Sequence, residues 1–129
     1  SANDKALMKN LERIDHLTPS IIIALIVFFI AITFVGPYLE EHTFRGIFKE
    51  TIFKRGAFVS PLILSSAIFS INHASGNIIG FLMYMLMGMG MYMAYQRRGS
   101  LKDSILVHML NNASASITMI LGLIYIILK

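Results

Sequence analysis

Residues 20–39 read SIIIALIVFFIAITFVGPYL, a stretch of twenty residues without a charged side chain. At about 1.5 Å per residue, a helix of this length crosses a hydrocarbon core of roughly 30 Å, so the stretch predicts a transmembrane helix. The whole chain of 129 residues has the same character, being 56% hydrophobic and 14% charged, whereas soluble domains are about a quarter charged. The composition excludes a water-soluble globule and indicates an integral membrane protein.

Further apolar stretches follow the first, and together they predict an all-α polytopic membrane bundle with about four transmembrane helices. Residues 40–55 are amphipathic and are expected to carry the first helix out of the membrane, after a kink or break at Gly36 and Pro37. The other three spans are expected at residues 59–71, 78–95 and 104–128.

The length favours one domain, which we divide into two parts. Residues 1–19 are interpreted as a polar N-terminal segment, the remnant of a longer N-terminal region or the start of a processed or minimal form. Residues 20–129 are interpreted as the transmembrane core. The chain has no cysteine, which excludes a disulfide framework, a thiolate metal site and a cysteine nucleophile.

The net charge of +4 is better explained by membrane topology than by binding to nucleic acid. Residues 45–55 and 97–102 hold seven of the eleven Lys and Arg residues. Positively charged loops are retained on the cytoplasmic side of a bilayer. We therefore expect these loops in the cytoplasm and both termini outside.

Six methionines alternate strictly from Met83 to Met93. Alternation suggests a strand or a copper site, but an open strand cannot cross lipid because its backbone groups would be unpaired. In a helix the same spacing scatters the sulfur atoms around the cylinder. The pattern therefore favours soft packing and lipid contact over a metal site.

Three polar clusters interrupt the apolar stretches. An ionisable side chain inside a membrane costs at least about 2.5 kcal/mol, so each cluster requires a partner or a function. In each cluster two residues stand four positions apart and share one helix face: Glu41 and Arg45, Phe69 and His73, and His108 and Asn112. Glu40 adds a second carboxylate to the first cluster.

Counting residues from the turns indicates whether these faces meet. Glu40 and His73 lie at nearly the same distance from the turn near Gly56, whereas His108 lies closer to its own turn by about 10 Å. The mismatch disappears if residues 49–55 project beyond the lipid into water. We therefore expect the glutamates, the histidines and the asparagine to gather in one lipid-shielded pocket.

Such a pocket suits hydrolysis of an amide or an ester. A desolvated glutamate can act as a general base toward water, while histidine and asparagine can donate to a developing oxyanion. Alternatively, Glu40, His73 and His108 could bind zinc with a water in the open position. Neither a Ser-His-Asp arrangement nor a phosphate-binding loop is signalled.

The sequences E-E-H-T-F-R-G at residues 40–46, F-S-I-N-H at 69–73 and H-M-L-N-N at 108–112 resemble the motifs EExxxR, FxxxH and HxxxN. These motifs belong to the CPBP family, the CAAX-processing and bacteriocin-processing intramembrane endopeptidases, which are also labelled abortive-infection proteins. The resemblance covers residues 34–115. Three linked motifs in the same order form a far more specific signal than any one of them.

The resemblance implies a role for each motif residue. Glu40 would activate the attacking water, and His73 would share in activating or coordinating it. Glu41 and Arg45 would orient the water or form a buried pair that supports the site. His108 and Asn112 would polarise the scissile carbonyl. Any metal, with zinc as the candidate, would be held by Glu40, His73 and His108.

The resemblance also implies a location and partners: the plasma membrane, in a bacterial source, with membrane lipid and a peptide or protein substrate. Eukaryotic members cleave prenylated CAAX proteins, whereas peptide maturation, signalling or bacteriocin immunity is expected in bacteria. The alternative function is a non-catalytic membrane protein of the same fold, acting in immunity or partner regulation. In that case Glu41 with Arg45 would be only a structural ion pair, and His108 with Asn112 an interhelical contact.

Overall fold

The computed structural model describes residues 9, 18–73 and 76–127, and these residues form helices without a strand. The elements follow one another in this order: α2 (Pro19–Ile30), η1 (Ala31–Val35), α3 (Gly36–Glu41), η2 (His42–Phe48), α4 (Lys49–Ile52), α5 (Val59–His73), α6 (Ile78–Arg98) and α7 (Leu101–Ile127). The elements η1 and η2 are π-helical. Most of the N-terminal segment expected at residues 1–19 lies outside the described residues, so that expectation stays a prediction.

The first helix runs without interruption from Pro19 to Ile52, so the break expected at Gly36 and Pro37 was wrong. In a regular α-helix the Pro37 nitrogen could not donate a hydrogen bond to the Thr33 carbonyl four residues back. The proline ring would also clash with that carbonyl. The π-helical turn η1 lies directly before Pro37, and the Gly36 N–H donates to the Ala31 carbonyl five residues back. The wider turn accommodates the proline inside a continuous helix.

Among the described residues, three helices are long and apolar enough to cross a membrane: Pro19–Ile52, Ile78–Arg98 and Leu101–Tyr125. The second expected span is the exception, because α5 has only 15 residues. At about 1.5 Å per residue it is roughly 22 Å long, less than a hydrocarbon core of about 30 Å. Three long helices and one shorter apolar helix among the described residues therefore correspond to the four helices expected, and the all-α bundle is confirmed.

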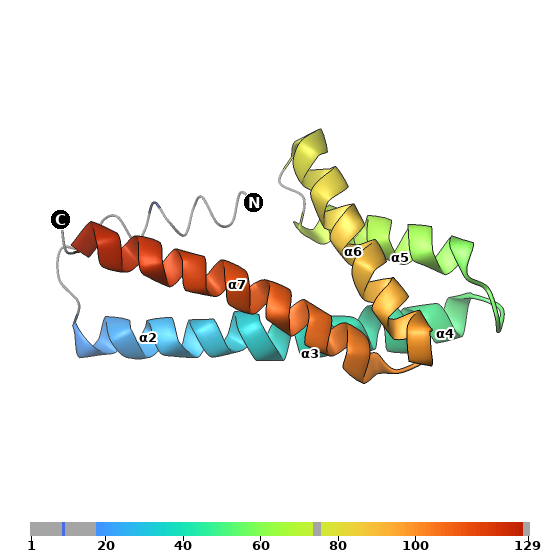
Figure 1. The fold of residues 1–129 in the computed structure, drawn as a ribbon, viewed down its shortest axis with the longest axis horizontal. Coiled ribbons are helices and arrows are strands. Elements are labelled where there is room, and N and C mark those ends of the chain that lie inside the picture. The colour runs from blue at the N-terminus through green and yellow to red at the C-terminus, as the bar shows by residue number, and fades with distance from the viewer. Residues whose placement is uncertain (1–8, 10–17, 74–75, 128–129) are drawn as a thin grey trace.

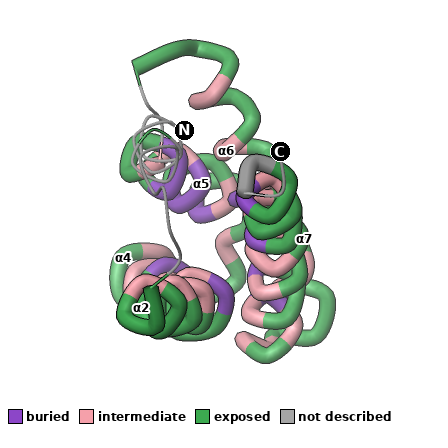
Figure 2. The backbone as a smooth tube through the Cα atoms, turned by 90° about the vertical axis from the view of Figure 1, so that its left-hand side faces the viewer, coloured by how far each residue is buried: buried purple, intermediate pink, exposed green. Residues whose placement is uncertain are grey.

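The helices form two groups that share the middle of the first helix (Figure 1). The helix α6 packs mainly on α5 and also on α7, while α7 packs on η1 and α3. Buried residues lie on the helix faces turned inward, and the outer faces of α2 and α7 are largely exposed (Figure 2). Because those outer faces carry Ile, Leu and Val, they suit contact with lipid.

The centre of the bundle is small and mixes apolar with polar side chains. Phe44, Phe69 and Met91 form its buried apolar cluster, with Tyr84 and Met87 packed against it. Met91 is only 2% exposed, whereas Met83 and Met93 lie on the outer surface. The alternating methionines thus lie on a helix and divide between core and surface, in agreement with the packing interpretation.

Gly88 on α6 lies against Ser66 of α5. A Cβ atom at this position would lie 3.1 Å from both Cα and Cβ of Ser66, so Ser66 and its backbone would have to shift by a few tenths of an ångström. We expect Gly88→Ala to lower the free energy of unfolding by about 1–3 kcal/mol through overpacking. Gly90→Ala is the matched control, because a Cβ there meets nothing within 4 Å.

The pair of variants is compared by titrating the detergent-solubilised protein with denaturing detergent and following helix content. Equal stability of the two variants would contradict the close approach of α5 and α6 at Gly88.

Candidate active site

The five charged and imidazole side chains of the three sequence motifs come together in the middle of the bundle. Glu40 and Glu41 end α3, and Arg45 lies one turn further in η2. His73 is the last residue of α5, and His108 lies in the first third of α7. Residues up to 68 positions apart in the sequence therefore meet, as the depth count predicted.

Glu40 lies between the two histidines. Its Oε2 is 3.7 Å from Nε2 of His73 and 3.8 Å from Nε2 of His108. The side chains of Glu40 and His73 are 34% and 30% exposed, whereas that of His108 is only 2% exposed. Glu40 and His73 thus form the accessible edge of the site, and His108 lies behind them.

The hydrogen bonds of the two imidazoles assign their tautomers. His73 Nδ1 lies 2.8 Å from the Phe69 carbonyl, and His108 Nδ1 lies 2.9 Å from Oε1 of Glu41. Because both partners can only accept, each Nδ1 carries the proton, and each neutral ring presents a bare Nε2.

These bare nitrogens face the Glu40 carboxylate. Its Oε2 is buried and has no hydrogen-bond partner among the described residues. Three acceptors that face one another require a donor or a positive charge between them. A water molecule has two protons to donate, so one placed about 2.8 Å from Glu40 Oε2 and from one imidazole Nε2 would bridge that pair with ordinary hydrogen bonds.

Glu41 and Arg45 form a buried ion pair directly behind this centre. Arg45 Nη1 donates to Glu41 Oε1 at 3.1 Å, and both side chains are fully buried. The same oxygen of Glu41 accepts from His108 Nδ1. Arg45 Nη2 donates to the Gly88 carbonyl at 2.7 Å. The network therefore ties the first helix to α6 and α7 and fixes the orientation of the His108 ring.

Aromatic rings complete the environment of the arginine. The guanidinium carbon of Arg45 lies 5.9 Å from the Phe44 ring centre and 5.6 Å from that of Phe69. Ring faces attract a cation, and more strongly where water is excluded. Phe69 also presents an edge-to-face contact to His108, with ring centres 5.6 Å apart. The phenylalanine of the second motif thus supports both the arginine and a histidine.

The His73 imidazole is held between two rings. Phe69 stacks on it at 4.3 Å and 29°, and Tyr84 of α6 stacks on it at 5.1 Å and 28°. Together with the Nδ1 bond to Phe69, this arrangement fixes both the plane of the imidazole and the direction of Nε2. Tyr84 belongs to none of the motifs, and only the contact between α5 and α6 identifies it as a positioning residue.

We expect Tyr84→Leu to lower kcat about tenfold, because an aromatic contact is worth roughly 0.5–1.5 kcal/mol and its loss frees the His73 ring. Tyr84→Phe keeps the ring and should retain most of the activity. The comparison is made with steady-state kinetics on the peptide substrate described below. Equal losses in both variants would assign the effect to the phenol hydroxyl and would contradict the stacking role.

Asn112 is the one predicted site residue that bonds elsewhere. Its Nδ2 donates to the Ile32 carbonyl at 2.8 Å, and its Oδ1 accepts from Asn111 Nδ2 at 3.3 Å. Ile32 lies in the π-helical turn η1, whereas Asn112 lies on α7, one turn beyond His108. An amide nitrogen carries two protons, so one N–H of Asn112 holds η1 and the other is available to a further acceptor.

Glu40, His73 and His108 are residue types that bind zinc, but the distances between their ligand atoms are longer than those in a zinc site. Zinc bonds of about 2.0–2.1 Å in tetrahedral geometry separate two ligand atoms by roughly 3.3 Å. The separations of 3.7 and 3.8 Å from Glu40 Oε2 are larger. Within the described residues, no group of three or more His, Asp or Glu side chains is arranged to hold a metal ion.

Comparison with known families agrees with the motifs. Residues 20–114, about three quarters of the chain, match the family model described as type II CAAX prenyl endopeptidase Rce1-like. The chain belongs to the Rce1-like family. No curated protein and no solved structure matched it. The Rce1-like match extends from the first membrane helix to just beyond Asn112, so it includes all three motifs.

Three features of this Rce1-like site have no signal in the sequence motifs. They are the Tyr84 ring, the Gly88 carbonyl that accepts from Arg45, and the Ile32 carbonyl that accepts from Asn112. Two of them are backbone groups, which any residue could supply. At Gly88 the sequence shows only that the residue is small, which fits its close contact with Ser66.

Proposed function

We propose that the chain is an intramembrane endopeptidase that hydrolyses a peptide bond of a membrane-associated peptide or protein with a glutamate-activated water. The observation that carries the proposal is the position of Glu40 Oε2, buried, unpartnered among the described residues and facing Nε2 of both histidines. Membership of the Rce1-like family supports the same class of reaction.

In the proposed reaction a water molecule binds between Glu40 and His73 at the accessible edge of the site. Glu40 accepts a proton as the water oxygen attacks the scissile carbonyl carbon, while His73 Nε2 accepts a hydrogen bond from the same water and orients it. The C–N bond then breaks, and the proton held by Glu40 passes to the leaving amine. The atoms balance without a cofactor.

The developing oxyanion requires donors on the opposite side of the water. Asn112 has an N–H beyond the one bonded to Ile32. His108 can donate from Nε2 when it carries a second proton, and Glu41 accepts from its Nδ1 at 2.9 Å. The pairing with a carboxylate stabilises an imidazolium, so Glu41 supports the proposed role of His108.

The family description points to prenylated CAAX substrates, and the site lies between helices long and apolar enough to cross a membrane. We therefore propose a peptide with a lipid-modified C-terminal segment as the substrate class, and the bacterial plasma membrane as the location. Peptide maturation and bacteriocin immunity are cellular roles compatible with this chemistry.

The test uses the full chain reconstituted into lipid nanodiscs. A farnesylated peptide ending in a CAAX sequence and the same peptide without the farnesyl group are each incubated with the protein, and the products are identified by mass spectrometry. We expect endoproteolytic cleavage of the farnesylated peptide. Lack of cleavage of both peptides by the folded protein would overturn the proposed substrate class.

A second experiment, with a chelator, tests whether a metal ion takes part in the reaction. Elemental analysis of the purified protein and activity after dialysis against a chelator are measured on the same sample. The separations around Glu40 favour a bridging water, so we expect activity to survive chelation. Loss of activity that is restored by zinc would instead assign Glu40, His73 and His108 as metal ligands.

A further inference from the structure

A second concave region lies away from the proposed active site, between the first helix and the junction of α6 and α7. The cavity has a volume of about 600 Å³. One wall is a stripe of the first helix at four-residue intervals: Tyr38, His42, Gly46 and Glu50. The other wall consists of Tyr95, residues 99–102 and Ile105. We name this region the junction groove; it contains none of the residues proposed for catalysis.

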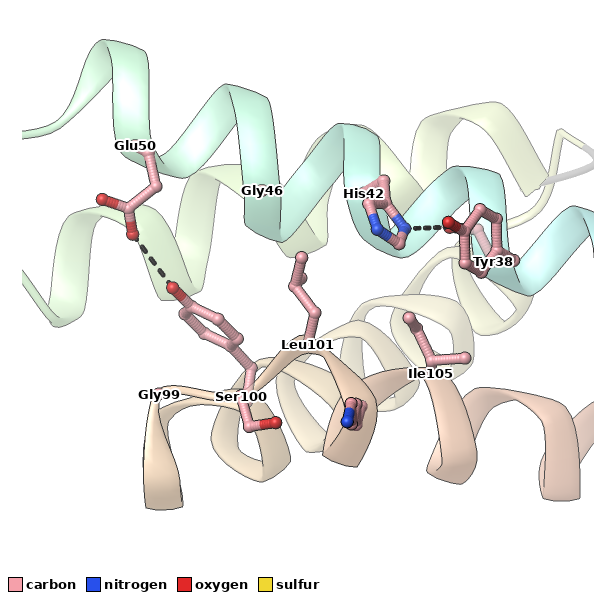
Figure 3. A pocket seen from close by; sticks show the side chains of 10 residues that line it. Tyr38, His42, Gly46, Glu50, Gly99, Ser100, Leu101 and Ile105 are labelled. Atoms are coloured by element: carbon pink, nitrogen blue, oxygen red, sulfur yellow. Dashed lines mark hydrogen bonds between the residues drawn. The ribbon is translucent and has the colours of Figure 1, made fainter.

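The junction groove has a polar end and an apolar end (Figure 3). Glu50, Tyr95 and Ser100 lie at one end, where the Tyr95 hydroxyl donates to Glu50 Oε1 at 2.9 Å. Tyr38, His42 and Ile105 lie at the other end, with Leu101 between the two ends. The His42 imidazole adds a polar group there, but its Nδ1 is already 2.8 Å from the Tyr38 carbonyl. An amphiphile with a polar head and an apolar chain matches this division.

The absence of a side chain at Gly46 keeps the middle of the groove open. A Cβ atom there would already lie 3.5 Å from Cδ1 of Leu101, so a larger side chain would fill the space between the two walls.

The charge around the polar end is strongly positive. Residues 49–55 and 97–103 hold six Lys and Arg residues and two acidic residues. Both acidic residues are already paired, Glu50 with Lys49 and Asp103 with Arg98. Lys102, which lines the groove, has an exposed ammonium group. A negative headgroup is therefore attracted to this end, at roughly 1 kcal/mol per basic residue near a charged membrane surface.

We propose that the junction groove binds an anionic phospholipid from the surrounding bilayer. Its phosphate lies near Lys102 and Ser100 at the polar end, and one acyl chain follows Leu101 and Ile105 toward Tyr38. Tyr95, whose hydroxyl bonds to Glu50 at the polar end, suits the boundary between headgroups and hydrocarbon, where amphipathic rings gather. The inference is independent of the proposed peptidase reaction.

The chain contains no tryptophan, so a single introduced indole reports on its own surroundings without background. Tyr38→Trp places the reporter in the groove, and Leu110→Trp places it on the exposed outer face of α7. Each variant is reconstituted into phosphatidylcholine vesicles that contain a minor share of phosphatidylglycerol with brominated acyl chains. Bromine quenches indole fluorescence at contact distance, so quenching measures the local concentration of the anionic lipid.

We expect stronger quenching in the Tyr38→Trp protein than in the Leu110→Trp protein, and equal quenching when the bromine is carried by phosphatidylcholine. Adding Lys102→Gln to the Tyr38→Trp protein should weaken the apparent affinity for phosphatidylglycerol about fivefold. Lys54→Gln removes the same charge outside the groove and should have a smaller effect. Circular dichroism verifies that each variant is folded.

Two results would overturn the proposal. Equal quenching of the two reporters by brominated phosphatidylglycerol would show only bulk lipid at the groove. Equal effects of Lys102→Gln and Lys54→Gln would show a general attraction of the charged surface for anionic lipid and no site. Neither result depends on cleavage of a peptide, so the outcome is separate from the test of the peptidase function.

Discussion

Glu40→Gln is expected to lower the rate of peptide hydrolysis by about 10²–10⁴-fold, the contribution usual for a general base. The amide is nearly isosteric with the carboxylate but cannot accept the proton of the attacking water. Because Glu40 is one third exposed at the edge of the cluster, the variant should fold and melt like the parent. Turnover of the farnesylated peptide in nanodiscs measures the effect.

The control for this variant is Glu50→Gln. Glu50 lies on α4 at the end of the same helix, and its side chain is 53% exposed, away from both histidines. We expect it to retain most of the activity. Full activity of Glu40→Gln would exclude the glutamate mechanism. A biological function, such as immunity, that is unaffected by Glu40→Ala at equal expression would favour the non-catalytic alternative.

The largest loss of stability is expected for Arg45→Met. The substitution leaves the fully buried Glu41 carboxylate without its ion-pair partner and the Gly88 carbonyl without its donor. Breaking one side of a buried pair costs about 3–5 kcal/mol, because the remaining charge is uncompensated. The free energy of unfolding is measured by titration with denaturing detergent, followed by circular dichroism.

Two further variants distinguish the cost of leaving a buried charge unpaired from the effect of losing any positive charge. Arg97→Met removes a side chain that is 74% exposed and 3.9 Å from Asp103, and exposed pairs contribute only about 0–1 kcal/mol. The double variant Glu41→Gln with Arg45→Met removes both buried charges and should regain part of the lost stability. A single Arg45→Met variant as stable as Arg97→Met would contradict the buried network.

Hydropathy was sufficient to predict the helical bundle. Long apolar stretches in this chain have no stable form in lipid other than a helix, because each backbone group must be bonded internally. The spacing of Glu41 with Arg45, and of His108 with Asn112, then placed the polar groups on defined faces. The depth count correctly predicted that Glu40 and His73 would share a level, although it required residues 49–55 to extend beyond the lipid to include His108.

Other features depend on tertiary contacts that leave little mark on the sequence. The π-helical turns η1 and η2 were not expected. The wider turn of η1 is why Pro37 does not break the first helix. The Tyr84 stack on His73 requires the crossing of α5 and α6. Asn112 was expected beside the scissile carbonyl, but its only bonds to described residues are to Ile32 and Asn111.

The short length of α5 has a consequence for the lipid around it. A helix that is roughly 8 Å shorter than the hydrocarbon core produces hydrophobic mismatch, which bilayers relieve by local thinning. His73 is the last residue of this helix, so we expect any thinning beside the edge where Glu40 is accessible. The membrane itself would then shorten the path by which water reaches the scissile bond.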